Sequence, residues 1–397
     1  MDQKITDRTW VAIIAGGQGT RLFPLSHDAC PKQFCHLDDN NTFIQATIKR
    51  FLKIGIKPSR IVVITTNENQ TYLAKEQCIP LGVLSLNIHQ IPSYFGYAGA
   101  MVKAAELIHK IASKAIIINT PADQYIAYDE NFENTIKNAI ESASSGTPTI
   151  IGVKISDLVT VMGCGHAIYD PEEPVTNNCY RVKGFIEKPK EKEAKKLMLS
   201  DTSACNTGIN VWAAKSLLEA ISSSEIDETG LNTDTLMQKL GNLKLAVGEF
   251  RWYDCGTLKS LYDISTKTPN HKNANLGKGK VKRTDCRRSL FYSIEGIELR
   301  ATNMKDCAVL ATVIDDRVIV AVVKLADSQR VKGLAEDYQL HKDFLTDDFS
   351  VSSRNNIIVP TNFSKEIRVG FVGVDNCIVY THKNDDDTIE IAVSATI

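Results

Sequence analysis

The sequence has no hydrophobic run long enough to cross a lipid bilayer and no excess of charge of one sign. A membrane-spanning helix needs about 20 apolar residues, whereas the longest runs here, such as residues 318–323, have the length of a strand. Lysine and arginine total 46 and aspartate and glutamate total 47, so no overall field would attract nucleic acid or an anionic membrane. Basic residues that bind an anionic substrate must therefore gather locally, which favours a pocket.

A secretory signal and a cysteine pair of the C-x-x-C type are also missing. Charged residues such as Asp2 and Arg8 precede an apolar run that covers only residues 11–15, which is too short for the core of a signal peptide. The ten cysteines are scattered, a pattern typical of free thiols in a reducing compartment. We therefore expect a cytoplasmic protein.

Cys30, Cys35 and His36 lie close enough in the sequence to suggest a metal site. Structural zinc sites use four ligands at characteristic spacings, and no fourth ligand with such a spacing appears. We therefore interpret the two cysteines as small thiols near a buried turn.

The first ~260 residues alternate strand-like and helix-like segments. Apolar runs of strand length lie at residues 11–15, 61–66 and 115–119. Segments with helical periodicity lie at residues 43–52, 98–112 and 130–143. This alternation predicts a Rossmann-like α/β domain, residues 1–265, with a mostly parallel sheet whose ligands bind beyond the carboxyl ends of the strands.

The composition changes near residues 266–284, which are rich in Lys, Asn, Gly and Thr and which we interpret as a linker. Beyond it, short strand-like runs dominate residues 285–397 and predict a β-rich C-terminal domain. An offset of 70 residues superimposes several apolar positions of this region and suggests a repeated unit. The matching pairs are Val281 and Val351, Ile297 and Ile367, Cys307 and Cys377, Val309 and Val379, Asp315-Asp316 and Asp385-Asp386, and Val323 and Val393.

A glycine-rich loop, AGGQGTRLFPLS at residues 15–26, follows the first predicted strand. Its glycines let backbone N–H groups point at an anion, and Arg21 adds a forked cation suited to phosphate. A Rossmann dinucleotide loop would need a third glycine where Leu22 stands, and a Walker A loop would need a lysine that is absent. A purely structural turn is the remaining alternative. Arg21, Pro24 and the PKQF segment at residues 31–34 favour phosphate binding.

The loop and PKQF together resemble the signature of the mannose-1-phosphate guanylyltransferases, a branch of the sugar-nucleotide pyrophosphorylase family. Four further segments are similar to motifs of that family and occur in the expected order: PAD at 121–123, FIEKP at 185–189, CNTGINVW at 205–212 and WYDCGT at 252–257. The resemblance covers about 260 residues. Two segments depart from it, at residues 93–100 and 161–167, where the family binds the nucleotide.

The resemblance implies transfer of a nucleotidyl group from GTP to mannose 1-phosphate, with release of pyrophosphate. An oxygen of the sugar phosphate would attack the α-phosphorus in line, so catalysis consists of alignment and charge stabilisation. The implied ligands of Mg²⁺ are Asp123 and Asp254, and the implied catalytic residues are these two with Arg21, Lys32 and Lys188. The implied nucleotide-binding residues are Ala15, Gly16, Gly17, Gly19, Thr20, Arg21 and Gly163. The implied sugar-phosphate site contains Gly165, Glu187, Lys188 and Asn206.

Two other functions are weighed against this one. The altered segments favour a weakly active or inactive paralogue that binds a sugar nucleotide and regulates a partner, whereas retention of both metal aspartates argues against it. A C-terminal isomerase domain would need clustered histidines, and only His271, His341 and His382 follow residue 270. Residues 285–290 instead resemble the start of the β-helix with which the family forms homodimers, so we expect a β-helix-like tail and a dimer.

Overall fold

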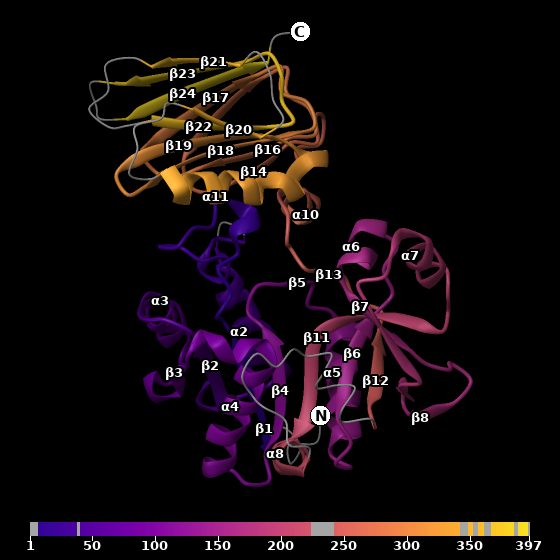
Figure 1. The fold of residues 1–397 in the computed structure, drawn as a ribbon. Helices are drawn as coiled ribbons and strands as arrows, with labels where there is room; N and C mark the ends of the chain where they lie inside the picture. The colour runs from indigo at the N-terminus through magenta and orange to yellow at the C-terminus, as the bar shows by residue number, and fades with distance from the viewer. Residues whose placement is uncertain are drawn as a thin grey trace. The chain divides into compact units, whose positions relative to one another are not determined.

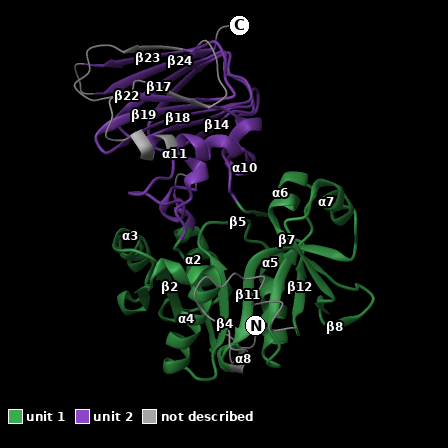
Figure 2. Cartoon of the chain, viewed as in Figure 1, with its two compact units in different colours: residues 1–16, 44–254 green, residues 17–43, 255–397 purple. Residues whose placement is uncertain are grey.

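The computed structural model describes residues 7–37, 40–223, 242–341, 348–351, 356–360, 367–384 and 388–395. The chain forms two compact units (Figure 2). Unit 1 comprises residues 1–16 and 44–254, and unit 2 comprises residues 17–43 and 255–397. Residues 17–26 of the glycine-rich loop therefore belong to the same unit as the C-terminal strands, whereas Ala15 and Gly16 belong to unit 1.

Unit 1 is built on a mixed sheet with the strand order β3-β2-β1-β4-β11-β6-β12-β9-β8, in which β7 pairs with both β10 and β11 (Figure 1). The strands of this unit are β1 (Thr9–Ile14), β2 (Ile61–Thr65), β3 (Ile88–Gln90), β4 (Ile116–Pro121), β5 (Tyr125–Ile126), β6 (Thr149–Val153), β7 (Gly165–Ile168), β8 (Pro174–Thr176), β9 (Cys179–Arg181), β10 (Gly184–Glu187), β11 (Ser203–Ala213), β12 (Lys244–Gly248) and β13 (Trp252–Tyr253). Strands β3, β2, β1 and β4 pair in parallel, whereas β11 runs antiparallel to both β4 and β6.

The helices of unit 1 connect these strands. They are α2 (Phe43–Ile54), α3 (Glu68–Cys78), α4 (Gly96–Ile111), α5 (Glu130–Ala143), α6 (Leu158–Gly163), α7 (Glu191–Met198) and α8 (Ala214–Ser223). Side chains of Asn67, Asp129 and Asp157 cap the first turns of α3, α5 and α6 by accepting backbone N–H bonds. Every residue of β1 is buried, and α4 packs its alanine-rich face into the same core. These contacts anchor the central strands in the core of unit 1.

Unit 2 contains a six-stranded sheet, β14-β16-β18-β19-β22-β20, and a five-stranded sheet, β15-β17-β24-β23-β21. Its strands are β14 (Ala274–Leu276), β15 (Lys280–Thr284), β16 (Leu290–Ser293), β17 (Ile297–Thr302), β18 (Cys307–Ile314), β19 (Arg317–Lys324), β20 (Asp348–Val351), β21 (Ile357–Pro360), β22 (Ile367–Val372), β23 (Cys377–Lys383) and β24 (Ile389–Ala395). Its helical segments are η1 (Thr20–Leu22), η2 (Lys32–Phe34), α10 (Leu258–Ile264), η7 (Leu325–Val331) and α11 (Lys332–His341).

Two hairpins of unit 2 are paired with other strands in a similar way. β18 and β19 form an antiparallel pair in which Cys307 faces Lys324, and β23 and β24 form one in which Cys377 faces Ala395. The second strand of each hairpin also pairs in parallel with a strand far from it in the sequence. β19 pairs with β22, and β24 pairs with β17. Asp385 and Asp386, which the 70-residue offset places opposite Asp315 and Asp316, lie outside the described residues.

The glycine-rich loop packs on α11 within unit 2. The ring of Phe23, just after η1, lies 5.4 Å from the ring of Tyr338 on α11. Both side chains are only 2% exposed. The Tyr338 hydroxyl donates a hydrogen bond to the Asp315 carboxylate at 3.3 Å, and the Arg368 guanidinium lies 5.8 Å from the Tyr338 ring. The C-terminal region thus forms part of the support of the loop.

The predicted fold class is confirmed: an α/β domain whose sheet has a parallel core, β3-β2-β1-β4, is accompanied by a β-rich domain with many parallel strand pairs. The structure differs from the sequence-based expectation at residues 266–284, where we expected a linker and the structure has β14 and β15. Ala274 and Leu276 of β14 are buried, whereas β15 alternates half-buried and exposed residues. β15 is an edge strand, and charged side chains on an edge strand hinder pairing with a further strand. This is why its sequence is as rich in lysine as that of a linker.

Candidate active site

The carboxyl ends of β1 and β4 form the starting point of the site in unit 1. These strands pair in parallel with Ile14 opposite Pro121, so both chains leave the sheet at the same edge. The N–H of Ala122 donates to the carbonyl of Ile14 at 3.1 Å, and the N–H of Ala15 donates to Ile64 at 2.8 Å. This places Asp123, which follows β4, at the same edge as Ala15 and Gly16.

Gly16 is held by two side chains that the sequence patterns did not indicate. The Thr66 hydroxyl donates to the Gly16 carbonyl at 3.2 Å, and the Gln70 amide donates to it at 3.3 Å. Thr66 and Gln70 are themselves joined by a 2.9 Å hydrogen bond. The nearest indication in the sequence is Asn67, a residue type that commonly caps helices. Its side chain accepts the Gln70 N–H at the start of α3 and so fixes the turn that carries both residues.

A two-stranded ladder brings the two predicted metal aspartates together. β5 and β13 pair antiparallel with Tyr125 opposite Tyr253, so Asp123 and Asp254 lie at the same end of this ladder. The Trp252 indole N–H donates to the Gln124 side-chain oxygen at 3.0 Å and locks the pair of strands. A pocket of about 500 Å³ opens beside β13 and is lined by residues from 154–160 and 248–253.

The N-T-G segment of β11 contacts this ladder. β11 is irregular between Asn206 and Asn210, where its pairing with β6 shifts. The Gln124 amide donates to the Thr207 carbonyl at 2.7 Å, and the Tyr97 hydroxyl donates to the Gly208 carbonyl at 3.0 Å. Desolvation and the nearby Asp123 carboxylate raise the pKa of Tyr97. Asn206 thus projects from a bulge that is tied to the segment following β4.

Gly165, Glu187 and Lys188 come together through the pairing of β7 with β10, in which Gly165 faces Glu187. A Cβ on Gly165 would lie 2.5 Å from both a Glu187 carboxylate oxygen and the Phe185 ring, so a side chain there would displace both. The Lys188 ammonium lies 3.2 Å from the Glu187 carboxylate, and the Lys188 N–H donates to the Cys164 carbonyl at 3.2 Å. Gly163 is exposed at the end of α6, with open space around its Cα.

Electrostatic effects on Cys205 link these groups. A hydrogen bond with Cys164, burial and the charges of Asp254 and Glu187 all raise the pKa of Cys205. His166, which follows Gly165, has its pKa lowered by burial, and its ring nitrogen Nε2 is 2.9 Å from the Val161 carbonyl. The acidic side chains from β10 and from the end of β13 therefore surround the start of the N-T-G segment.

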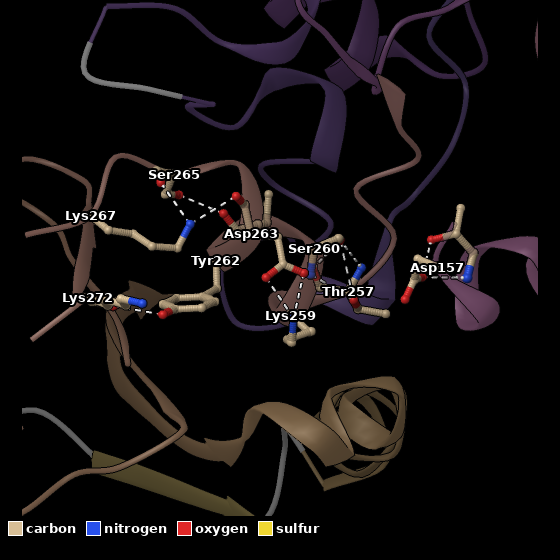
Figure 3. Close-up of polar contacts among 11 residues, drawn as sticks. Asp157, Thr257, Lys259, Ser260, Tyr262, Asp263, Ser265, Lys267 and Lys272 are labelled. Carbon is tan, nitrogen blue, oxygen red and sulfur yellow. Dashed lines mark hydrogen bonds and ion pairs between the residues drawn. The ribbon is translucent and has the colours of Figure 1, made fainter. Parts of the chain in front are cut away.

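Two residues of this region have a left-handed backbone, which is costly for a residue other than glycine. Lys188 has φ 43° and Cys255, directly after Asp254, has φ 54°. The chain then enters α10, where Thr257 and Ser260 form a reciprocal capping box (Figure 3). The ion pair of Lys259 with Asp263, 2.6 Å, supports the next turn of this helix (Figure 3).

In unit 2, the glycine-rich loop gathers the predicted phosphate-binding residues. Gly19 has φ 71°, and a Cβ at this position would overlap the Cβ of Lys32. The Ser26 hydroxyl donates to the Gly19 carbonyl. Lys32 is only 5% exposed, and its ammonium lies 5.6 Å from the ring centre of Phe43. Gly17 is exposed with open space around it, Thr20 begins η1, and Arg21 is exposed.

The structure therefore brings together two sets of predicted site residues, each within one unit. Unit 1 assembles Asp123, Asp254, Asn206, Gly165 and Glu187 with its neighbour Lys188, and unit 2 assembles Gly19, Lys32 and the loop that carries Arg21. Across the described residues, no group of three or more His, Cys, Asp or Glu side chains has the arrangement of a metal site. Nor does any helix among them have the length and apolar character needed to span a membrane.

Comparisons with known proteins assign the chain to a family. The family model described as "Nucleotidyl transferase" matches residues 11–271. Mannose-1-phosphate guanylyltransferase 2 of Escherichia coli O157:H7 is 28% identical over 373 residues, which is 85% of this chain and 75% of the relative. A mannose-1-phosphate guanylyltransferase of Sinorhizobium fredii (strain NBRC 101917 / NGR234) is 26% identical over 358 residues, 82% of this chain and 68% of the relative.

A solved structure has a similar fold. The crystal structure described as mannose-1-phosphate geranyltransferase from Thermus thermophilus matches with a TM-score of 0.70 and 23% sequence identity, covering 84% of this chain and 99% of that one. At this identity the match shows the fold alone. The family match, by contrast, spans β1 to the segment beyond α10 and includes every predicted site residue. The family predicted from the sequence motifs is confirmed, and this chain is an enzyme of the nucleotidyl transferase family.

Proposed function

We propose that the chain transfers the guanylyl group of GTP to mannose 1-phosphate and releases pyrophosphate. The observation that supports this proposal most is the β5–β13 ladder, because Asp123 precedes β5 and Asp254 follows β13 in an antiparallel pair. Gln124, which lies between Asp123 and β5, bonds to the segment that follows Asn206. The names of the relatives, mannose-1-phosphate guanylyltransferases, support the choice of base and sugar. No protein nucleophile is needed, since the attacking sugar phosphate is already anionic.

The donor set fits Mg²⁺. Mg²⁺ binds oxygen ligands and commonly uses only one or two carboxylates together with water and substrate phosphates. Asp123 and Asp254 would hold it, and when bound it would neutralise charge on the reacting phosphates. The left-handed residues next to this site, Lys188 and Cys255, support a functional role because such strain is retained where the surrounding structure imposes a geometry.

The basic residues would align the two anionic substrates. In the glycine-rich loop, Gly16, Gly17 and Gly19 would offer backbone N–H groups to the triphosphate, and Arg21 and Lys32 would supply its counter-charges. Low exposure strengthens the field of the Lys32 ammonium. The nucleotide-binding set further includes Ala15, Thr20 and Gly163.

Lys188 would bind the sugar phosphate, because its exposed ammonium is held beside Glu187 at the end of β10. Glu187 and Asn206 would hydrogen-bond sugar hydroxyls, and Gly165 would leave room for them. The absence of a Cβ at Gly165 allows the Glu187 carboxylate to approach the backbone closely. Such positioning lowers the entropic cost of bringing the two substrates into line.

We further infer that the enzyme works in the cytoplasm as a homodimer. The ten cysteines are free thiols in the structure, as expected for a reducing compartment. The resemblance of residues 285–290 to the start of the β-helix with which the family forms homodimers supports a second copy of this chain as the partner.

The test is a pyrophosphate-release assay that crosses GTP, ATP, UTP and dTTP with mannose, glucose and fucose 1-phosphates. GTP with mannose 1-phosphate should give the highest kcat/KM. A preference for dTTP or UTP would move the activity to a sister branch of the family. Binding of GDP-mannose without pyrophosphate release from any pair would instead identify a regulatory paralogue. Asp254→Asn serves as the matched control, since it keeps the side-chain shape and removes the charge.

A further inference from the structure

Two thiols face each other across the segment that carries Lys32. The Sγ atoms of Cys30 and Cys35 are 3.6 Å apart. A disulfide has a sulfur–sulfur distance of about 2.05 Å, so the two atoms would need to approach by about 1.5 Å. Cys30 precedes Pro31 and Cys35 follows η2, so a bond between them would close a ring around Lys32.

The two thiols differ in access. Cys30 is half-buried, whereas Cys35 is 3% exposed and its Sγ lies 3.2 Å from the Leu25 carbonyl. The hydrogen bond from Cys35 lowers the pKa of Cys30, and the same bond together with burial raises the pKa of Cys35. An accessible thiol with the lower pKa reacts first, and a buried neighbour is placed to resolve the product.

We propose that Cys30 and Cys35 form a disulfide-forming modification site whose oxidising substrate is a low-molecular-weight disulfide. The Cys30 thiolate attacks one sulfur of that disulfide and releases one small thiolate. The Cys35 sulfur then attacks Cys30 in the mixed disulfide and releases the second. The protons of Cys30 and Cys35 leave on the two released thiols, so the protein loses two electrons and the small disulfide gains them.

The ring would change the position of Lys32 in the loop. Gly19 and Lys32 are in direct backbone-to-side-chain contact, and the Ser26 hydroxyl holds the Gly19 carbonyl. Oxidation also removes the thiol hydrogen of Cys35, whose Sγ lies 3.2 Å from the Leu25 carbonyl oxygen. Oxidation should therefore weaken GTP binding, and reduction should restore it. This consequence rests on the proposed role of Lys32 in binding the triphosphate.

The first experiment detects the bond without using activity. The folded chain is equilibrated with mixtures of reduced and oxidised glutathione, alkylated, unfolded and cut with trypsin. Cleavage after Arg21, Lys32 and Lys49 places Cys30 in peptide 22–32 and Cys35 in peptide 33–49. The site predicts a joined pair of these peptides that disappears on treatment with dithiothreitol and in both Cys30→Ser and Cys35→Ser.

Cys78 provides the matched control. It is a buried thiol whose pKa burial raises to about 12, so Cys78→Ser should leave the joined pair unchanged. The proposal is overturned if peptides 22–32 and 33–49 of the folded wild-type chain remain separate and fully alkylated at the highest ratio of oxidised to reduced glutathione.

The second experiment measures GTP affinity by calorimetry in the reduced and oxidised chain. Loss of a charge-assisted contact predicts at least about a tenfold weaker affinity after oxidation, and no change in Cys30→Ser. Cys30→Ser is the preferred variant because its thiol is half-buried and the substitution disturbs packing least. Equal affinities of the reduced and fully joined wild-type chain would refute the link to Lys32. If the reduced chain fails to bind GTP at all, the proposed function fails while the peptide experiment still decides the disulfide.

Discussion

Phe23 and Tyr338 are far apart in the sequence, but their rings are in contact. We therefore predict that α11 influences nucleotide binding by supporting the glycine-rich loop. Tyr338→Ala removes a ring that is 2% exposed. Truncation of a buried aromatic side chain costs about 3–5 kcal/mol of unfolding free energy. Of this, about 0.5–1.5 kcal/mol belongs to the ring pair itself. Because the loop that carries Arg21 and Lys32 rests on this pair, part of the loss should appear in GTP affinity.

The size of that part can be worked out from the ring pair alone. A loss of about 1 kcal/mol lowers the equilibrium constant between the docked and undocked loop about fivefold. When the undocked loop is the more populated form, the docked fraction falls by the same factor. The Kd of GTP should therefore rise about fivefold or more in Tyr338→Ala. Tyr338→Phe keeps the ring and removes only the bond to Asp315, an exposed carboxylate that water can solvate, so its effect should be small.

The assay combines urea unfolding with calorimetric GTP titration. A double-mutant cycle compares Phe23→Leu, Tyr338→Leu and the double variant. The expected coupling energy in GTP binding is about 0.5–1.5 kcal/mol. Tyr380→Ala is the control, since Tyr380 is a 37% exposed tyrosine of the same unit. If Tyr338→Ala lowers stability but binds GTP with the affinity of the wild type, and the cycle shows no coupling, α11 does not position the loop.

Three further predictions test the other proposals. Asp123→Ala and Asp254→Ala should each lower kcat by at least about 10²-fold with folding intact, measured as pyrophosphate release over a range of Mg²⁺ concentrations; near-normal rates in both would remove the metal assignment. Lys188→Ala should raise the KM of the sugar phosphate much more than that of GTP, whereas Arg21→Ala should do the opposite, and an exchanged pattern in the titrations would reverse the two roles. A chain ending at Thr266 should be monomeric or aggregated in light scattering at concentrations where the whole chain is a dimer; an unchanged number of copies per assembly would show that the C-terminal region does not dimerise it.

The sequence predicted the elements of the site better than their partners. The glycine-rich loop was singled out because closely spaced glycines followed by Arg21 form a short pattern, and the two aspartates were singled out by their resemblance to family motifs; their roles remain predictions. The closeness of Asp123 to Asp254 was not derivable, because β5 and β13 are two residues long each and show no periodicity. Thr66 and Gln70 were missed because a threonine and a glutamine at the start of a helix have no distinctive spacing.

The antiparallel placement of β11 and the position of residues 17–43 in unit 2 depend on contacts far apart in the chain. An apolar run has the same appearance in a parallel and an antiparallel strand, so the direction of β11 could not be read from its composition. Phe23 likewise has the sequence context of a loop residue, and only the folded chain shows that a tyrosine of the C-terminal region covers its ring. Tertiary contacts of this kind override local pattern.

The crossed pairing of the two hairpins in unit 2 has a consequence for the order of events during synthesis. β17 acquires its partner β24 only through the register of Ile297 with Ile389, and β22 completes the other sheet in the same way. The five-stranded sheet therefore needs residues 389–395 to join β17 to β23, and the six-stranded sheet needs residues 367–372 to join β19 to β20. Since such distant pairings are slow to form, the glycine-rich loop, although made early, would obtain the support of Tyr338 only after α11 has been made and packed.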